Sequence, residues 1–566
     1  MSNEELIERL EDAVELMELT EVNVFKINAY RKLIQSLESD SRQVQNLDRE
    51  EICKLYSKGM AAVLNELLAS GTFSELTELE KEVPTGVRSL LRINGIGPKK
   101  VRALWKDAGI ESTAELKKFC QEGKVSQLKG FGDKIQHSIL EGIAYLEQVE
   151  GRLLLHKADA LADGMEMEWK TAGINSVYRT GQFRTNPETI SSLDFLFPVS
   201  ERKKVQKWSE ENPDLELLPE KSGPMHLRFR HRTSGCMLSL FFSSEDNRDR
   251  ISFSLETEQK HWLEARNAGK NLYQVWKKGL PADDIYRSLG TAGIPPALRN
   301  GSFEWEEGFE KRLPDLVQYR DVKGCLHNHS RWSDGKNSIR EMADWCRKQG
   351  WTYFGIADHS RSAGYANGLS EDSVYSQWAE IDALNGEYRN EFRVLKGIEC
   401  DILGDGSLDY PEEILAGFDY VVASVHSIMK MDIRTATSRL IKAIENPYTS
   451  ILGHCSGRIL LRRPGYPLDY DKVIDACIAN GVAIELNAHP ARLDMDFHHL
   501  QSALEKGAMI SVNPDAHEDS GMAYTEYGIR MAMKAGASAE QVLNCLPLSG
   551  VLKYLNEKKK SNAIHG

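Results

Sequence analysis

The sequence predicts a multidomain protein in which an α-helical N-terminal part precedes a C-terminal α/β domain with a parallel sheet. Apolar residues recur at helical spacing near the N-terminus, and two G-x-G turns lie between helical patterns in the next segment. From about residue 320 onwards, short apolar runs alternate with helical patterns, which is typical of β/α units. A chain of 566 residues is long enough for three or four domains.

Residues 1–80 are expected to form a small helical domain. One face of its first helix carries apolar residues at steps of four, four and three, namely Leu6, Leu10, Val14 and Met17. A second helix is expected to begin within residues 25–31. This region by itself indicates only a helical bundle.

Residues 81–150 contain two similar glycine turns, each followed by lysine. The residues concerned are Gly95, Gly97, Lys99 and Lys100 in the first turn, and Gly130, Gly132 and Lys134 in the second. Glycines at a helix start leave backbone N–H groups free to bind a phosphate, and lysines add positive charge. The pair resembles tandem helix-hairpin-helix motifs, which bind the DNA backbone without reading its sequence. A plain helical connector is the alternative.

The charge distribution agrees with a local anion-binding surface. Residues 81–140 carry 12 lysines and arginines against 6 aspartates and glutamates, a net charge of +6. The whole chain carries a net charge of −13, which argues against nonspecific coating of nucleic acid by its entire surface. We therefore expect DNA to bind at the hairpins.

In the C-terminal domain, polar residues repeatedly follow the apolar runs. Nine of them lie at six expected strand ends: His327, His329, Asp334, His359, Glu399, His426, His454, Asp515 and His517. The carboxyl ends of parallel strands meet at one rim of a β/α barrel, so these side chains should converge. Imidazole and carboxylate ligands together suit Zn, Mn or Fe better than Mg. The pattern predicts a multinuclear hydrolytic metal centre.

Residues 320–520 resemble the PHP (polymerase and histidinol phosphatase) phosphoesterase domain, which we expect to extend over residues 320–560. The matching pieces include His327-Asn328-His329, Gly397-Ile398-Glu399 and Asp515-Ala516-His517. The resemblance implies a distorted seven-stranded β/α barrel that holds three divalent transition-metal ions, Mn or Zn with Fe as an alternative. It also implies that the same nine residues are the ligands. Cys325 stands where many relatives carry Asp.

Further residues near these motifs are candidates for supporting roles. Arg458, Arg462 and Arg492 are expected to contact phosphate, with surface salt bridges as an equal alternative. Asp358 is expected to orient a ligand, and His489 to lie at the rim.

The order of these parts resembles the bacterial family X DNA polymerases over nearly the whole chain. The resemblance implies an α/β nucleotidyltransferase-like palm at 151–245 and a thumb at 246–312. The family's palm holds two Mg²⁺ ions with three carboxylates. Here Asp194 remains, but Ser192 and Ser239 occupy the other two positions, so we expect a folded palm without polymerase activity. Val63 stands where lyase-competent relatives carry lysine, which argues against a lyase role.

Three functions are compatible with these patterns. The first is a metal-dependent DNA phosphodiesterase, either a 3′–5′ exonuclease or a repair nuclease. The second is a small-molecule phosphomonoesterase of the histidinol-phosphatase type, against which the hairpins argue. The third is a non-catalytic DNA-binding scaffold, which would be expected to show eroded metal ligands. No apolar run reaches membrane-spanning length and the nine cysteines form no C-x-x-C pair, so we expect a cytoplasmic protein without a membrane partner.

Overall fold

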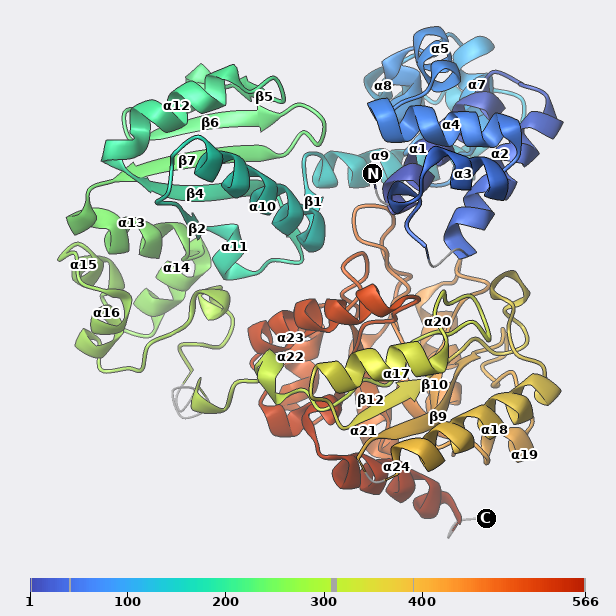
Figure 1. The fold of residues 1–566 in the computed structure, drawn as a ribbon. Helices are drawn as coiled ribbons and strands as arrows, with labels where there is room; N and C mark the ends of the chain where they lie inside the picture. Colours follow the sequence, from blue (N-terminus) through green and yellow to red (C-terminus); the bar gives the residue numbers. More distant parts are fainter. Residues whose placement is uncertain (2, 40–41, 307–312, 390, 564–566) are drawn as a thin grey trace. The chain divides into compact units, whose positions relative to one another are not determined.

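The structure is a computed structural model that describes residues 1, 3–39, 42–306, 313–389 and 391–563. The chain forms two compact units, Met1–Glu150 and Gly151–Gly566 (Figure 1). In the described part of the chain, no helix is both long and apolar enough to cross a membrane. Residues 307–312, the end of the expected thumb, lie outside the described residues.

The first unit is entirely helical in its described elements. Its first five α-helices are α1 (Asn3–Leu19), α2 (Val24–Ser39), α3 (Arg49–Leu55), α4 (Lys58–Ser70) and α5 (Ser74–Glu82). The predicted apolar face of α1 is confirmed, because Leu6, Leu10 and Met17 are fully buried. The expected second helix is α2, which begins at Val24.

Each glycine turn lies between the two helices of one helical hairpin in the same unit. The helices are α6 (Thr85–Leu91), α7 (Pro98–Lys106), α8 (Thr113–Gln121) and α9 (Asp133–Val149). Gly142 of α9 packs closely against the first turn, since a Cβ there would lie 2.8 Å from Ile93 Cγ2. The two hairpins therefore form one packed body.

The second unit begins with a five-stranded sheet of order β2-β4-β7-β6-β5, which corresponds to the expected palm. Its strands are β2 (Tyr178–Thr180), β4 (Ser192–Pro198), β5 (Leu215–Leu217), β6 (His226–His231) and β7 (Met237–Ser243). The helices α10 (Leu155–Thr171) and α12 (Arg202–Glu211) accompany this sheet. Trp169 of α10 packs edge-on against Phe195 and Phe197 of β4, with ring centroids 4.8 and 5.1 Å apart. These aromatic contacts hold α10 on the sheet.

A helical segment follows the sheet in the region expected to be the thumb. Its α-helices are α13 (Arg248–Leu255), α14 (Gln259–Asn267), α15 (Leu272–Trp276) and α16 (Ala282–Ser288). They share a small core that includes Phe253, Ile285 and Tyr286.

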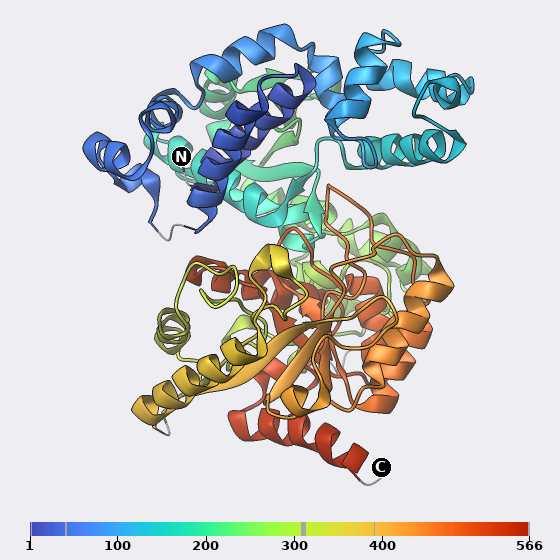
Figure 2. The ribbon, with the colours of Figure 1, turned by 90° about the vertical axis from the view of Figure 1, so that its right-hand side faces the viewer.

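The remainder of the unit contains a six-stranded parallel sheet of order β13-β12-β11-β10-β9-β8 (Figure 2). Its strands are β8 (Tyr353–Ile356), β9 (Arg393–Asp401), β10 (Tyr420–Ser424), β11 (Thr449–Leu452), β12 (Ala483–Asn487) and β13 (Ile510–Asn513). Five strands match the apolar runs in the sequence, whereas β12 was not predicted. The strands are buried on both faces, as parallel strands covered by helices usually are.

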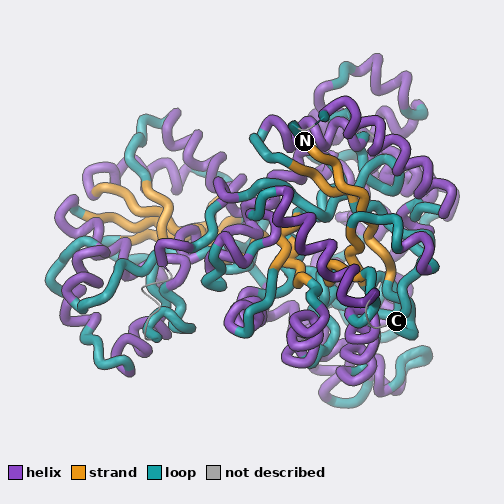
Figure 3. Tube along the Cα trace, turned by 90° about the horizontal axis from the view of Figure 1, so that it is seen from below, coloured by secondary structure: helices purple, strands orange, loops and turns teal. Residues whose placement is uncertain are grey.

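Helices lie before, between and after these strands (Figure 3). The alternation of strands and helices was predicted from the sequence. The helices are α17 (Ile339–Lys348), α18 (Glu371–Tyr388), α19 (Glu412–Leu415), α20 (Ile433–Ile444), α21 (Tyr470–Asn480), α22 (Phe497–Glu505), α23 (Thr525–Lys534) and α24 (Leu548–Ala563). Ser338 caps α17 with a reciprocal capping box to Glu341, which explains why this helix begins there.

The segment 324–329 closes this sheet without forming a regular strand. On one side the carbonyl oxygen of Asn328 accepts a bond of 2.8 Å from the Ala357 N–H beyond β8. On the other side the N–H of His329 donates to the carbonyl of Ala516 beyond β13, also at 2.8 Å. The short strand expected before His329 is therefore absent, and an irregular segment takes the seventh position of the curled sheet.

Asn544 supports this closure from outside the sheet. Its buried side chain accepts from the Val512 N–H at 2.6 Å and donates to the Gly324 carbonyl at 3.2 Å. Asn544→Ala would leave both backbone groups without these partners. We expect the free energy of unfolding of the second unit to fall by about 2–4 kcal/mol in urea unfolding curves. Lys553→Ala, which removes a largely exposed side chain, is the control and should change it by less than about 0.5 kcal/mol.

Candidate metal centre and nucleic-acid interface

The nine residues predicted as metal ligands lie close together at the carboxyl ends of the parallel strands. They form four overlapping groups in which the ligand atoms lie within 4.8 Å of one another. The groups are His329-Asp334-His359-His517, His327-His329-Asp515, His327-Glu399-His454 and His359-Glu399-His426. The barrel thus brings together residues that are up to 190 positions apart in the sequence, from His327 to His517.

Glu399, on β9, lies at the centre of this cluster. Its Oε1 is 2.9 Å from His454 Nε2 and 3.2 Å from His426 Nε2. The same oxygen is 3.3 Å from His327 Nε2, and Oε2 is 2.9 Å from His359 Nδ1. Two ligands of one transition-metal ion, each about 2.1 Å from it, stand about 3–3.5 Å apart. The spacing around Glu399 therefore fits a carboxylate shared between ions.

Two further carboxylates complete the cluster. Asp515 Oδ1 lies 3.0 Å from His329 Nε2. Asp334 Oδ2 lies 3.6 Å from His359 Nε2 and 3.5 Å from His517 Nε2. Asp334 and His517 are the more exposed members, so this side of the cluster is its open side.

The residues present fit divalent ions, because several buried ligand atoms make no hydrogen bond within the described residues, although charged groups lie near them. His327 Nε2, His329 Nδ1 and Glu399 Oε2 are buried and lack a hydrogen bond. An unpaired buried polar atom costs several kcal/mol, which a bound cation would offset. The donor set of nitrogen and oxygen without sulfur suits Mn, Zn or Fe.

Electrostatics in the cluster also favour cations. Burial by itself lowers the pKa of His327, but the carboxylates of Glu485, Glu399 and Asp515 raise it well above its ordinary value. Burial likewise opposes protonation of His426, yet Glu399 and Asp401 raise its pKa to about 10. Protons thus compensate the carboxylate charge in the metal-free protein. Metal ions would displace these protons on binding.

Two carboxylates that the sequence interpretation missed hold the ligands in place. Glu485 is fully buried on β12, and its Oε1 lies 2.7 Å from His327 Nδ1. Asp401 bonds to Nδ1 of His426. Each partner fixes the ring so that the other nitrogen faces the cluster. Two features of the sequence could have indicated these partners. Glu485 is an acidic residue inside the apolar run 483–487, and Asp401 is an acidic residue two positions after Glu399.

Asp358 supports a loop rather than a ligand ring. Its buried carboxylate accepts from the Ser330 N–H, from the Ser333 hydroxyl and from the Gln377 amide, at 2.7, 2.5 and 2.7 Å. Within the described residues, Asp358 therefore contacts no ligand ring, and any orienting role would act through the backbone. It fixes the turn that leads from His329 to Asp334.

The three arginines occupy different places. Arg492 Nε lies 3.5 Å from Asp515 Oδ2, beside the cluster. Arg458 instead pairs with Glu188 at 2.6 Å and donates to the Arg492 carbonyl, so it holds two segments together rather than facing phosphate. Arg462 is exposed and belongs to none of the four groups.

His489 also lies outside the four groups. Burial lowers its pKa to about 4, and its Nδ1 accepts from the Ala491 N–H at 3.2 Å. This neutral ring stabilises its own loop.

The hairpin glycines have the geometry of an anion-binding turn. Gly95 and Gly130 have φ values of +92° and +85°, which favour glycine. Gly97 and Gly132 immediately precede α7 and α9, so the backbone N–H groups that follow lie at helix N-termini. The three candidate lysines Lys99, Lys100 and Lys134 form no ion pair within the described residues, which leaves their charge available to phosphate.

Comparisons with known proteins agree with both regions. The family model for a SAM-like helix-hairpin-helix tandem matches residues 87–144, and the PHP domain model matches residues 326–489. The chain is 33% identical over 585 residues to the DNA polymerase/3′-5′ exonuclease PolX of Bacillus subtilis (strain 168), covering 98% of this chain and 99% of that protein. The chain belongs to the PolX family.

Other relatives of this PolX-family chain match its C-terminal domain. A probable phosphatase of Thermoanaerobacter sp. (strain X514) is 34% identical over 177 residues, covering 30% of this chain and 69% of that protein. The solved histidinol phosphate phosphatase of Lactococcus lactis, complexed with Zn, L-histidinol and phosphate, has 18% identity and a TM-score of 0.30. It covers 37% of this chain and 94% of its own.

The three positions expected to correspond to the palm carboxylates lie together on β4 and β7. Asp194 of β4 pairs in register with Ser239 of β7, which confirms that a serine occupies the neighbouring strand position. The Ser192 hydroxyl donates to Asp194 at 2.5 Å and lies 3.0 Å from the Ser239 hydroxyl. Burial raises the pKa of Asp194. These three positions therefore carry at most one negative charge.

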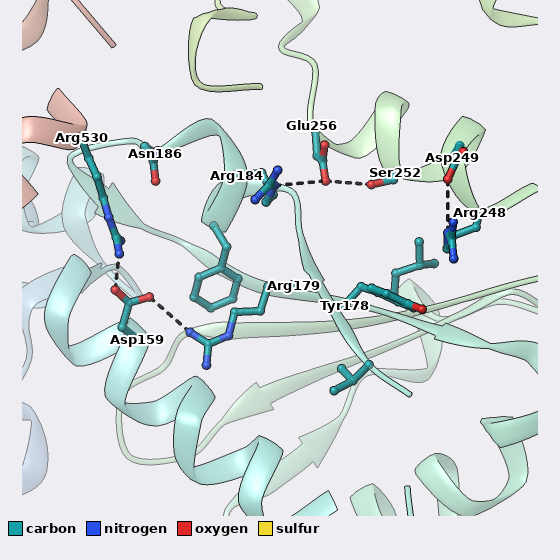
Figure 4. A pocket seen from close by; sticks show the side chains of 13 residues that line it. Asp159, Tyr178, Arg179, Arg184, Asn186, Arg248, Asp249, Ser252, Glu256 and Arg530 are labelled. Carbon is teal, nitrogen blue, oxygen red and sulfur yellow. Dashed lines mark hydrogen bonds and ion pairs between the residues drawn. The ribbon is translucent and has the colours of Figure 1, made fainter. Parts of the chain in front are cut away.

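A cavity of about 680 Å³ lies beside β2 and α13 (Figure 4). Its arginines are already paired: Arg530 lies 3.2 Å from Asp159, and Arg179 lies 2.6 Å from Glu166. Neither Asp194 nor any of the nine cluster residues lines it. The cavity is separate from both sites.

Removal of a cluster residue should release metal. We expect His327→Ala and Asp515→Ala each to lower the metal content of the purified protein, measured by elemental analysis after loading with Mn²⁺ or Zn²⁺. Asp194→Ala, in the palm, should leave that content unchanged. Unchanged stoichiometry in both cluster variants would contradict the assignment.

Glu485→Gln tests the supporting carboxylate, because it keeps the size of the side chain and removes its charge. We expect metal affinity to fall about 10- to 100-fold. Competition with a chelator measures this change. An unaltered affinity would show that Glu485 does not act through His327.

Proposed function

We propose that this chain is a metal-dependent DNA phosphodiesterase, a 3′–5′ exonuclease or repair nuclease, whose palm does not catalyse polymerisation. The observation that carries the proposal is the contrast between two sites in one unit. All nine cluster residues are present and converge, whereas the palm keeps only Asp194 of its three carboxylate positions. The Bacillus subtilis relative is named for both activities, polymerase and exonuclease.

The cluster would act on a phosphodiester through up to three divalent ions held by the nine residues. When bound, such ions supply a Lewis acid and a nucleophilic water. The protein's own residues prepare the site: Glu485 and Asp401 orient His327 and His426. Arg492, beside Asp515, adds positive charge that a substrate phosphate can pair with.

DNA is the proposed partner, and the hairpins of the first unit are the proposed contact. Their glycine turns and unpaired lysines suit backbone phosphates rather than base edges. The cytoplasm is the proposed location, because it gives such an enzyme access to bacterial DNA.

A small-molecule phosphomonoesterase is the second candidate. Relatives described as probable phosphatases favour it, since they match the domain that carries the cluster. These matches cover about a third of the chain and leave the hairpins unexplained. A metabolite enzyme has no use for a surface that binds DNA backbone, so we favour the phosphodiesterase.

The unmodified protein should shorten a labelled primer but not extend it. Two Mg²⁺ ions carry four positive charges, which Asp194 alone cannot hold in line with a 3′-hydroxyl and a nucleotide. Gel analysis should show Mn²⁺- or Zn²⁺-dependent degradation that is lost in His359→Ala and kept in Asp194→Ala. Templated incorporation that Asp194→Ala abolishes would show that the palm is active. Faster hydrolysis of a phosphomonoester than of DNA would favour the second candidate.

Replacing Lys99, Lys100 and Lys134 together by alanine should weaken DNA binding. Because these side chains would contact phosphates, the loss should be similar for unrelated sequences, and the slope of log affinity against log salt should become shallower by up to about 3. Fluorescence anisotropy at several salt concentrations measures both. Substituting the exposed lysines Lys203, Lys278 and Lys553 is the matched control. If both triple variants bind alike, the hairpins are not the contact.

A further inference from the structure

Two large apolar side chains are exposed next to the buried, charged metal cluster. Tyr365 is 73% exposed and Ile428 is 65% exposed. Tyr365 lies on the loop that follows His359, and Ile428 lies two residues after His426. The rings of these two histidines are 5.1 Å apart, so both loops leave the cluster from the same place.

The loop of Tyr365 is firmly held. The Ser360 N–H donates to the Glu399 carbonyl at 3.0 Å, and the Leu369 N–H returns to the His359 carbonyl at 2.9 Å. A Cβ at Gly368 would overlap the Ser360 carbonyl oxygen, so the two ends of the loop pack too closely for any residue other than glycine at this position. Tyr365 is therefore presented at a fixed position, with its ring centroid 6.1 Å from that of His359.

Tyr365 is close enough to the cluster to sense the charge of its carboxylates. Its pKa is raised by partial burial and then by the negative charges of Asp401 and Glu399. Tyr365 therefore lies beside a cluster residue, His359, while most of its surface is exposed to solvent.

Ile428 is held in a backbone conformation that its side chain disfavours. Its φ of +55° lies in the left-handed region, where a β-branched residue is strained. The Arg439 guanidinium fixes the peptide by donating to the carbonyls of Ser427 and Ile428, at 3.0 and 3.5 Å. Glycine or asparagine would fit this position with less strain. Strained residues cluster at functional sites, so Ile428 is a candidate for a functional contact.

We propose that Tyr365 and Ile428 form an apolar platform that contacts the terminal base of the DNA strand whose phosphodiester the cluster hydrolyses. This inference rests on the proposed function and adds its substrate contact. An aromatic ring stacks on any base, because every base has a π-face, so the platform suits an enzyme without sequence preference. It would also favour a nucleotide over a phosphate ester that carries no base.

The test uses two single-stranded oligonucleotides that differ only at the 3′ end, one with a normal terminal nucleotide and one with an abasic tetrahydrofuran residue. With Mn²⁺ present, the full-length protein should cleave the normal end faster. Tyr365→Ala should lower kcat/KM on the normal end about 5- to 150-fold and change it less than about twofold on the abasic end. Tyr365→Phe should keep the preference.

Ile428→Gly provides a second, independent variant. It removes the apolar side chain and relieves the backbone strain, so the preference for the normal end should fall. Thermal stability should change little, because relief of the strained φ offsets the greater freedom of glycine in the unfolded chain. Equal changes on both ends, or no change on either, in the Tyr365→Ala and Ile428→Gly variants would overturn the platform. If the unmodified, metal-loaded protein cleaves neither oligonucleotide, the proposed nuclease function is wrong, and the platform proposal must be rejected as well.

Discussion

The metal cluster depends on one buried carboxylate, that of Glu399. Its two oxygens lie 2.9 to 3.3 Å from nitrogens of four histidines: His327, His359, His426 and His454. Such a charge is stable in the interior only if it is compensated on every side. Each histidine comes from a different part of the barrel, so the compensation exists only when the strands are aligned and closed. The irregular segment 324–329 matters for this reason, because it places His327 opposite β9.

A network of buried polar groups extends from the cluster to the edge of the sheet. Glu485 holds His327 and also accepts from the His454 backbone N–H and the Asn513 amide, at 2.8 and 3.0 Å. Asn513 in turn accepts from the Leu326 N–H and from Asn544. The same hydrogen-bond network therefore orients the ligands and closes the barrel. A polar network of this kind is stable only when all its members are satisfied.

The sheet of β2, β4, β7, β6 and β5 does not depend on carboxylates for its packing. It is held by a core that includes Trp169, Phe195 and Phe197, none of which is part of a metal site. Serines at positions 192 and 239 replace charges that a metal-free palm would have to compensate, and they bond to Asp194 or to each other. The core of this sheet is therefore independent of the residues at positions 192, 194 and 239.

The sequence by itself determined most of what depends on neighbouring residues. The glycine turns, five of the six strands and the polar residues at their ends follow local patterns, and the resemblance to the PHP domain predicted which of these residues would be ligands. The tertiary structure decided the rest. Glu485 meets His327 across 158 residues, and Arg458 meets Glu188 across 270, so no local spacing reveals either pair. The exposure of Tyr365 and the strained φ of Ile428 were equally hidden, because an apolar residue in a sequence is expected in the core. Local periodicity can specify which side chains leave a strand end, but only the closed barrel specifies what each of them contacts.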